Sequence, residues 1–69
     1  MDLDYSTLSP VFDRLSRPAK RALINQGILT PGDLAAYSRA EVARLHGLGP
    51  SAFPVLAAAL AAAGLAFRN

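Results

Sequence analysis

Hydrophobic and polar positions along the chain follow a helical pattern. In residues 16–27, small and apolar side chains share one face at about 100° per residue, while Arg17, Lys20 and Arg21 lie on the opposite face with Ile24 among them. No stretch alternates apolar and polar residues with the β-branched enrichment of a strand. The sequence therefore predicts an all-α fold.

Start and stop signals divide the chain into short helices. Ser16 is a predicted N-cap, and Gly27 offers a left-handed stop. Thr30 and Ser38 each stand three residues before an acid, which is the pattern of a capping box. The expected helices cover part of 8–15, then 16–27, 31–37, 39–45 and a last segment that begins near Ser51 and ends at Gly64.

The same periodicity predicts which side chains form the core. With 69 residues there is room for one domain, which we assign to residues 8–69 after a polar segment at 1–7. The chain after the last helix is expected to fold back onto the core. The predicted inward-facing side chains are Val11, Phe12, Leu15, Val42, Leu45, Phe53, Leu56, Ala57, Leu60, Leu65 and Phe67.

Two turns of the chain resemble each other. A helix, Gly27-Ile28 and a capped helix are followed twenty residues later by a helix, Gly47-Leu48 and another helix. We call residues 26–30 the first glycine turn and residues 45–51 the second glycine turn. A duplicated unit of this length can pack with approximate two-fold symmetry, each unit burying the face that the other exposes.

Composition excludes several classes of function. The chain has no cysteine, so it can hold neither a disulfide nor a thiolate metal site. Its start is acidic and polar, and no run approaches the roughly 18 apolar residues of a membrane span, so we expect a soluble, cytoplasmic protein without membrane contact. His46 is the only histidine, and no constellation of catalytic residues is evident. We expect no enzyme activity, metal, cofactor or small-molecule substrate.

The basic side chains are clustered. The net charge of +2 is too small to indicate a nucleic-acid partner by itself. However, Arg14, Arg17, Lys20 and Arg21 fall within eight residues, which we call the basic segment. Such a cluster forms either a solvated helix face or a surface that binds an anion.

The second glycine turn is the candidate binding site. Glycine at positions 47 and 49 permits positive φ and removes Cβ atoms, so an anion can approach the main chain. Amide hydrogens from Leu48 to Ser51, excluding Pro50, can point at one phosphate, aided by the dipole of the following helix. Ser51 either caps that helix or donates its hydroxyl to the phosphate, and His46 either packs in the turn or contacts the phosphate. Alternatively, the glycines only allow a tight turn between helices.

The last helix carries a second candidate surface. No residue from Ser51 to Phe67 is charged, and Val55, Ala58 and Ala62 lie on the side predicted to face away from the core. Exposed alanines cost little in a helix, because alanine is the strongest helix former. The other interpretation is an interface for a protein partner or a second copy of the chain. We call these three residues the alanine face.

A longer combination of motifs resembles a known family. The motifs are RPAKRAL, then QGI before the capped TPGDLA, then SRAEVARLHGLGP and the terminal GLAF, over about residues 15–67. They resemble small bacterial helix-hairpin-helix proteins related to the C-terminal domain of the RNA polymerase alpha subunit. The resemblance implies a compact, SAM-like bundle of four or five short helices with a helix-hairpin-helix architecture and a non-enzymatic, DNA-associated role.

The resemblance also suggests how DNA would be held. In the polymerase domain, an arginine at the start of the first core helix and the hairpin before the last helix grip the minor groove. Here Pro18 aligns with that arginine, Gly49 matches the hairpin glycine, and Pro50 and Ser51 replace the lysines after it. We therefore expect weak, sequence-independent DNA binding. The predicted contacts are Gly47, Leu48, Gly49 and Ser51, supported by Arg17, Lys20 and Arg21.

Overall fold

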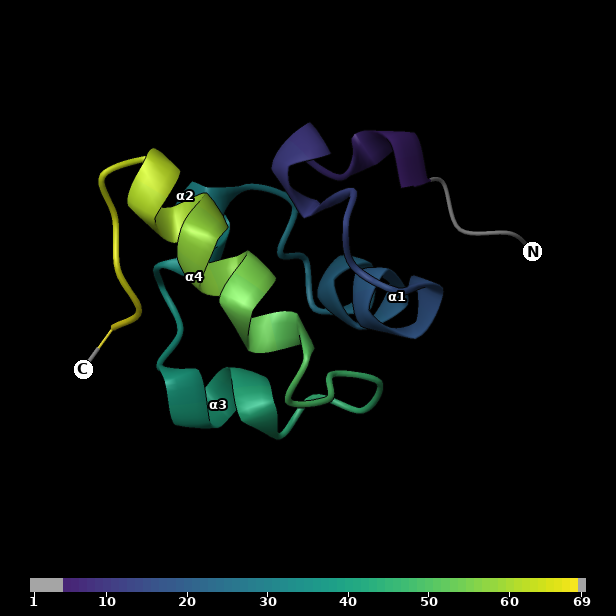
Figure 1. Cartoon of the computed structure of the whole chain (residues 1–69). Helices are drawn as coiled ribbons and strands as arrows, with labels where there is room; N and C mark the ends of the chain where they lie inside the picture. The colour runs from purple at the N-terminus through teal and green to yellow at the C-terminus, as the bar shows by residue number, and fades with distance from the viewer. Residues whose placement is uncertain (1–4, 69) are drawn as a thin grey trace.

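Helix α4 (Ala52–Ala62) is the longest element and crosses the middle of the molecule, with the other elements arranged around it (Figure 1). The computed structural model describes residues 5–68, and within this range every regular element is a helix or a 3₁₀ turn, so the all-α prediction is confirmed. The remaining elements, in chain order, are η1 (Tyr5–Thr7), η2 (Pro10–Phe12), α1 (Arg17–Asn25), α2 (Pro31–Leu34) and α3 (Arg39–Ala43).

Three of the five predicted helix starts are held by a hydrogen bond from the predicted cap. The Ser16 hydroxyl accepts a hydrogen bond from the Ala19 amide at 3.4 Å. Thr30 and Asp33 form a complete capping box at the start of α2, and Ser38 and Glu41 form another at the start of α3.

Helices α2 and α3 end earlier than predicted. The amide of Tyr37 donates to the carbonyl of Leu34, and the amide of Leu45 donates to that of Val42. These bonds span three residues instead of four, so the chain tightens into a 3₁₀-like turn after each helix.

The core lies between α4 and the elements around it, and α4 packs against α2 and η2. The predicted burial of Phe12, Leu15, Val42, Phe53, Leu56 and Leu60 is confirmed. The prediction for Ala57 is wrong, since Ala57 is exposed and Ala59 is buried in its place. Ala59 lies three residues after Leu56, so the two side chains share a face of the helix. The buried face of α4 is therefore rotated toward Ala59 and away from Ala57, relative to the face that the hydrophobic pattern predicts.

Two other apolar residues remain in contact with solvent. Val11 is 43% exposed and Leu65 is 40% exposed, so their predicted burial is wrong. Gly64 (φ +72°) ends α4 as predicted, and the Leu65 amide then donates to the Leu60 carbonyl. The side chain that returns to the core after this turn is Phe67, whose ring lies 6.2 Å from that of Phe53.

The segment after α4 runs back beside α3 (Figure 1). The amide of Arg68 donates to the carbonyl of Tyr37, and its guanidinium binds the Ala36 carbonyl and the Glu41 carboxylate. The Ser38 amide and the Arg68 guanidinium hold the pKa of Glu41 below its ordinary value of 4.5. The end of the described chain is therefore attached to the capping box of α3.

The predicted polar segment at 1–7 is described only in part. Residues 1–4 lie outside the described range, and η1 packs against α1. Between residues 5 and 68, none of the helices has the length and apolar character needed to cross a membrane.

Candidate functional site

The second glycine turn packs directly against the start of α1. Gly47 has φ +99°, and a Cβ atom built on it would lie 2.6 Å from the carbonyl oxygen of Pro18. Glycine is therefore required at position 47 both by backbone conformation and by close approach. This contact brings the turn beside the basic segment, which the sequence could not establish.

Not all main-chain amides of this turn are available to a ligand. The Leu48 amide donates to the Leu45 carbonyl at 3.2 Å, so the amide predicted to bind phosphate is already occupied. The Ala52 and Phe53 amides donate to the carbonyls of Gly49 and Pro50. Pro50 has no amide hydrogen, which leaves four amides of the turn without an acceptor in the described part of the chain. They belong to His46, Gly47, Gly49 and Ser51.

The start of α4 has no cap of its own. Ser51 occupies the N-cap position, as predicted, but its side chain makes no capping hydrogen bond, and the first turn of α4 contains no acid. Pro54 falls in that first turn, where its missing amide hydrogen breaks no helical bond. An anion at this end of α4 would meet free amides and the positive end of the helix dipole.

Arg14 shares a depression with the free amides. Its lining comes from Arg14, Leu15, Ser16 and Ala19 on one side and from Gly49, Ser51, Ala52 and Val55 on the other. Arg14 has no ion pair within residues 5–68, and no acid lines the depression. The prediction of site residues omitted Arg14, although it belongs to the basic segment, because its position relative to the turn depends on tertiary packing.

A second depression lies on the other side of the turn. Arg21, Asn25 and Pro18 line it from α1, and His46 and Gly47 line it from the turn. Of the three predicted supporting cations, Arg21 is thus placed beside the turn. Arg17 is exposed and Lys20 half-buried, and neither lines either of the two depressions.

Acidic side chains are scarce near this surface. Seven basic and three acidic residues lie between residues 5 and 68. Asp33 and Glu41 serve the two capping boxes, which leaves Asp13 as the one acid of this range outside a cap. The same range holds no cluster of side chains suited to a metal ion. The described residues that line the two depressions beside the turn therefore include arginines and no acid.

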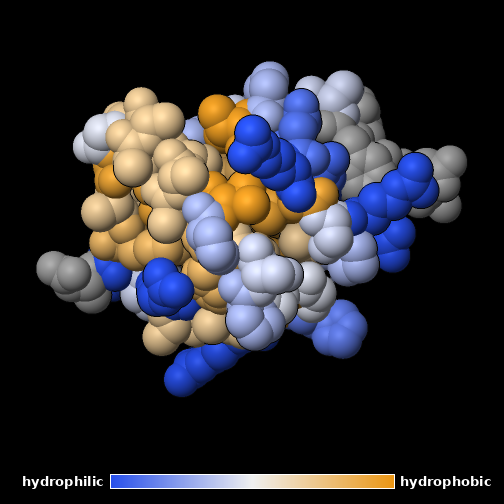
Figure 2. All heavy atoms as spheres, viewed as in Figure 1, coloured by the Kyte–Doolittle hydropathy of each residue, from blue (hydrophilic) through white to orange (hydrophobic). Residues whose placement is uncertain are grey.

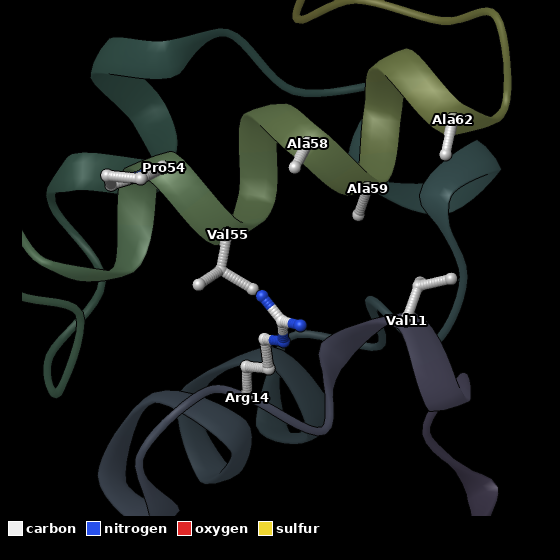
Figure 3. A pocket seen from close by; sticks show the side chains of 7 residues that line it. All are labelled: Val11, Arg14, Pro54, Val55, Ala58, Ala59 and Ala62. Carbon is white, nitrogen blue, oxygen red and sulfur yellow. The ribbon is translucent and has the colours of Figure 1, made fainter.

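The alanine face lies on the same side of α4 as the first depression. Ala58 and Ala62 are exposed and Val55 is half-buried. On the face of the molecule shown in Figure 2, hydrophobic residues gather over α4 and the hydrophilic ones lie mainly around them. Together with Val11, Pro54 and Ala59, the alanine face lines a groove that Arg14 also borders (Figure 3).

Comparisons of this chain with protein-family models, with curated proteins and with solved structures find no match. The features of the chain that bear on function are therefore the geometry of the second glycine turn and the groove beside it.

Proposed function

We propose that the chain is a helix-hairpin-helix module that binds the phosphate backbone of duplex DNA weakly and without sequence preference, through the second glycine turn. One observation carries the proposal. The amides of Gly49 and Ser51 have no acceptor within residues 5–68, and these two residues line a depression together with an unpaired arginine, Arg14. An oxygen of a phosphate supplies the acceptor that these groups lack.

The first glycine turn supports this interpretation from inside the same molecule. There, one carboxylate oxygen of Asp33 accepts hydrogen bonds from the Leu29 amide at 3.1 Å and the Thr30 amide at 3.2 Å. Twenty residues later, Gly49 corresponds to Leu29, and the buried Phe53 corresponds to Asp33. The second turn thus lacks the carboxylate that completes the first. Pro50 corresponds to Thr30 and has no amide hydrogen, so Gly49 is the equivalent amide that is left without an acceptor, and a phosphate oxygen would take the place of the carboxylate there.

The binding mode follows from these contacts. Main-chain amides and arginine side chains recognise the phosphate and not the base edges, so sequence preference is absent. Arg14 and Arg21 border the turn in two different depressions, each with unpaired charge in the described structure, and both would approach neighbouring phosphates. Because each neutralised phosphate releases counterions, affinity falls as salt rises.

The test is the substitution Gly49→Asp. A Cβ at Gly49 meets nothing within 4 Å and its φ is not positive, so the fold should tolerate the change. The new carboxylate can occupy the free amides and would repel a phosphate. Fluorescence anisotropy with a short labelled duplex should give at least about tenfold weaker binding at about 50 mM salt, which is about 1.4 kcal/mol.

The matched control is Ala57→Glu, which also adds one negative charge. Ala57 is exposed on α4 and lines neither depression beside the turn, so its effect should reflect net charge alone. We expect it to change affinity by less than about threefold. Absence of binding by the unmodified chain at low salt, or equal losses from the two substitutions, would refute the proposal.

The two bordering arginines give a second prediction. Arg14→Gln and Arg21→Gln should each lower the slope of log affinity against log salt by about one unit, the contribution of one phosphate contact. Arg39→Gln is the control, because Arg39 stacks on the Phe53 ring at 4.6 Å and lines neither depression. If all three substitutions lower the slope equally, the chain binds DNA by diffuse charge and not through this turn.

A further inference from the structure

The groove between α4 and η2 is the most apolar concavity described above. It has a volume of about 340 Å³ and is lined by six apolar residues and one arginine. In Figure 3, Val55, Ala58, Ala59 and Ala62 point from α4 into the space that Val11 borders from the opposite side. Val11 is 43% exposed although the core lies directly beneath it. The groove therefore leaves apolar surface in contact with water.

Arg14 supplies the only charge in the lining. Figure 3 shows its guanidinium extending toward Val55, inside the concavity and not away from it. No acidic residue lines the groove, and Arg14 has no ion pair between residues 5 and 68. The complementary ligand is an apolar segment that carries a carboxylate.

The dimensions of the groove fit a helical segment. Its α4 wall extends from Pro54 to Ala62, which at about 1.5 Å per residue is roughly 12 Å or two helical turns. Ala58 and Ala62 are one turn apart and have short side chains, so the main chain of a second helix can approach α4 closely. A helix that binds in this way inserts apolar side chains at three- and four-residue spacing.

A second copy of the chain is a poorer occupant. A symmetric dimer uses the same patch on both subunits, so its one interface would contain both copies of Arg14. The groove offers no acid to neutralise them. Like charges placed together at an interface oppose association. Charge complementarity thus favours a different partner.

From these observations we infer that the groove is a docking site for an acidic amphipathic helix of a partner protein. Small apolar side chains of the partner pack on Val11, Val55 and Ala58, and an Asp or Glu at the edge of its apolar face pairs with Arg14. Arg14 and Val55 line both this groove and the depression beside the second glycine turn, so a partner helix and a phosphate would compete for Arg14, whereas Gly49 and Ser51 do not line the groove.

The inference is testable with two synthetic peptides. Both are short amphipathic helices with Leu and Ala on one face, and they differ only in a Glu or a Gln at the edge of that face. Titration of the isotope-labelled chain, followed by NMR, should shift the signals of Val11, Val55 and Ala58 with the Glu peptide. The Gln peptide should bind about fivefold more weakly, which is near the upper end for an exposed ion pair.

Substitutions in the chain separate the groove from general charge effects. Ala58→Glu places a carboxylate in the groove and should abolish peptide binding, whereas Ala57→Glu, adjacent but outside the lining, should retain it within about twofold. In Arg14→Gln, the two peptides should bind equally, which isolates the pairing of Arg14 with the peptide carboxylate. Gly49→Asp should leave peptide binding unchanged even though it weakens DNA binding. Circular dichroism establishes that each variant is folded.

Several results would overturn the inference. These are equal affinities of the two peptides for the unmodified chain, signal shifts away from the groove, and no detectable binding of either peptide. Sedimentation of the unmodified chain as a dimer that Ala58→Glu dissociates would instead make the groove an interface between two copies.

Discussion

The first and second glycine turns begin alike and end differently. Gly27 and Gly47 have φ values of +77° and +99°, and each is followed by a buried residue, Ile28 or Leu48. After that point the first turn leads into a helix with a complete capping box, and the second leads into α4, whose N-cap makes no side-chain bond.

The two turns differ in which group accepts hydrogen bonds from their main-chain amides. In the first turn, Asp33 accepts hydrogen bonds from Leu29 and Thr30, so the main chain is satisfied internally. In the second turn, Phe53 occupies the corresponding position and is buried in the core. The amides of Gly49 and Ser51 have no acceptor in the described part of the chain, and both residues line a polar depression. The first turn therefore seals the start of its helix with a carboxylate, and the second turn leaves amides there open to a ligand.

The turns also differ in their packing. A Cβ added to Gly27 meets nothing within 4 Å, whereas one added to Gly47 would lie 2.6 Å from the Pro18 carbonyl oxygen. Gly27 of the first turn therefore has no close neighbour at the Cβ position, whereas Gly47 of the second turn packs directly against α1. The position of the free amides relative to Arg14 and Arg21 depends on this contact.

Gly47→Ala should have the largest effect on stability. The left-handed conformation costs an alanine about 1–3 kcal/mol, and the clash with Pro18 adds about 1–3 kcal/mol. Gly27→Ala has the strain without the clash, so it is the matched control. Urea denaturation should give a clearly lower midpoint for Gly47→Ala. Equal losses would mean that the second turn can move away from α1 without penalty.

Asp33→Ala should have the next largest effect. It removes the acceptor for two amides and one half of the capping box, at a cost of about 1–2 kcal/mol in the free energy of unfolding. DNA affinity should change by less than about threefold, because the site lies at the other turn. Thr30→Ser is the control, since it retains a hydroxyl acceptor for the Asp33 amide. A loss of DNA binding in the Asp33 variant would place the anion site at the first turn.

The capping box at the start of α3 should make the stability of the chain depend on pH in the acidic range. The Ser38 amide and the Arg68 guanidinium lower the pKa of Glu41, so its contribution to stability is complete above 4.5 and disappears as pH falls through the lowered value. Glu41→Gln should remove this part of the pH dependence. Thermal unfolding from pH 7 to pH 3 measures it, with Ala43→Gln, an exposed position of the same helix, as control. If the melting temperatures of Glu41→Gln and the unmodified chain fell in parallel as pH is lowered, Glu41 would not be the source of this pH dependence.

Features determined by neighbouring residues could be predicted from the sequence. The caps at Ser16, Thr30 and Ser38 and the left-handed stops at Gly27 and Gly64 depend on three or four consecutive residues, and all are confirmed. Such signals are local, because the capping side chain and the amide that it binds lie within one turn of helix.

Features determined by packing could not be predicted. The contact of Gly47 with Pro18, the position of Arg14 beside Gly49, and the exposure of Ala57 all depend on how α1 and α4 are oriented. The occupied amide of Leu48 depends on the exact course of the turn, where a bond to the Leu45 carbonyl forms. The sequence thus located the candidate turn but not the groups that it leaves available.

Gly49→Ala should have the smallest effect, and it separates the two glycines of one turn. Position 49 needs neither a positive φ nor an absent side chain, so alanine should leave the free energy of unfolding unchanged within about 0.5 kcal/mol. A methyl group removes no amide hydrogen and adds no charge, so DNA binding should weaken far less than in Gly49→Asp. Denaturation and anisotropy on the three proteins test both points. Gly49→Ala could instead weaken DNA binding as much as Gly49→Asp does while leaving stability intact. The loss of binding in both variants would then come from blocked approach of the phosphate to the main chain, and not from repulsion by the new carboxylate.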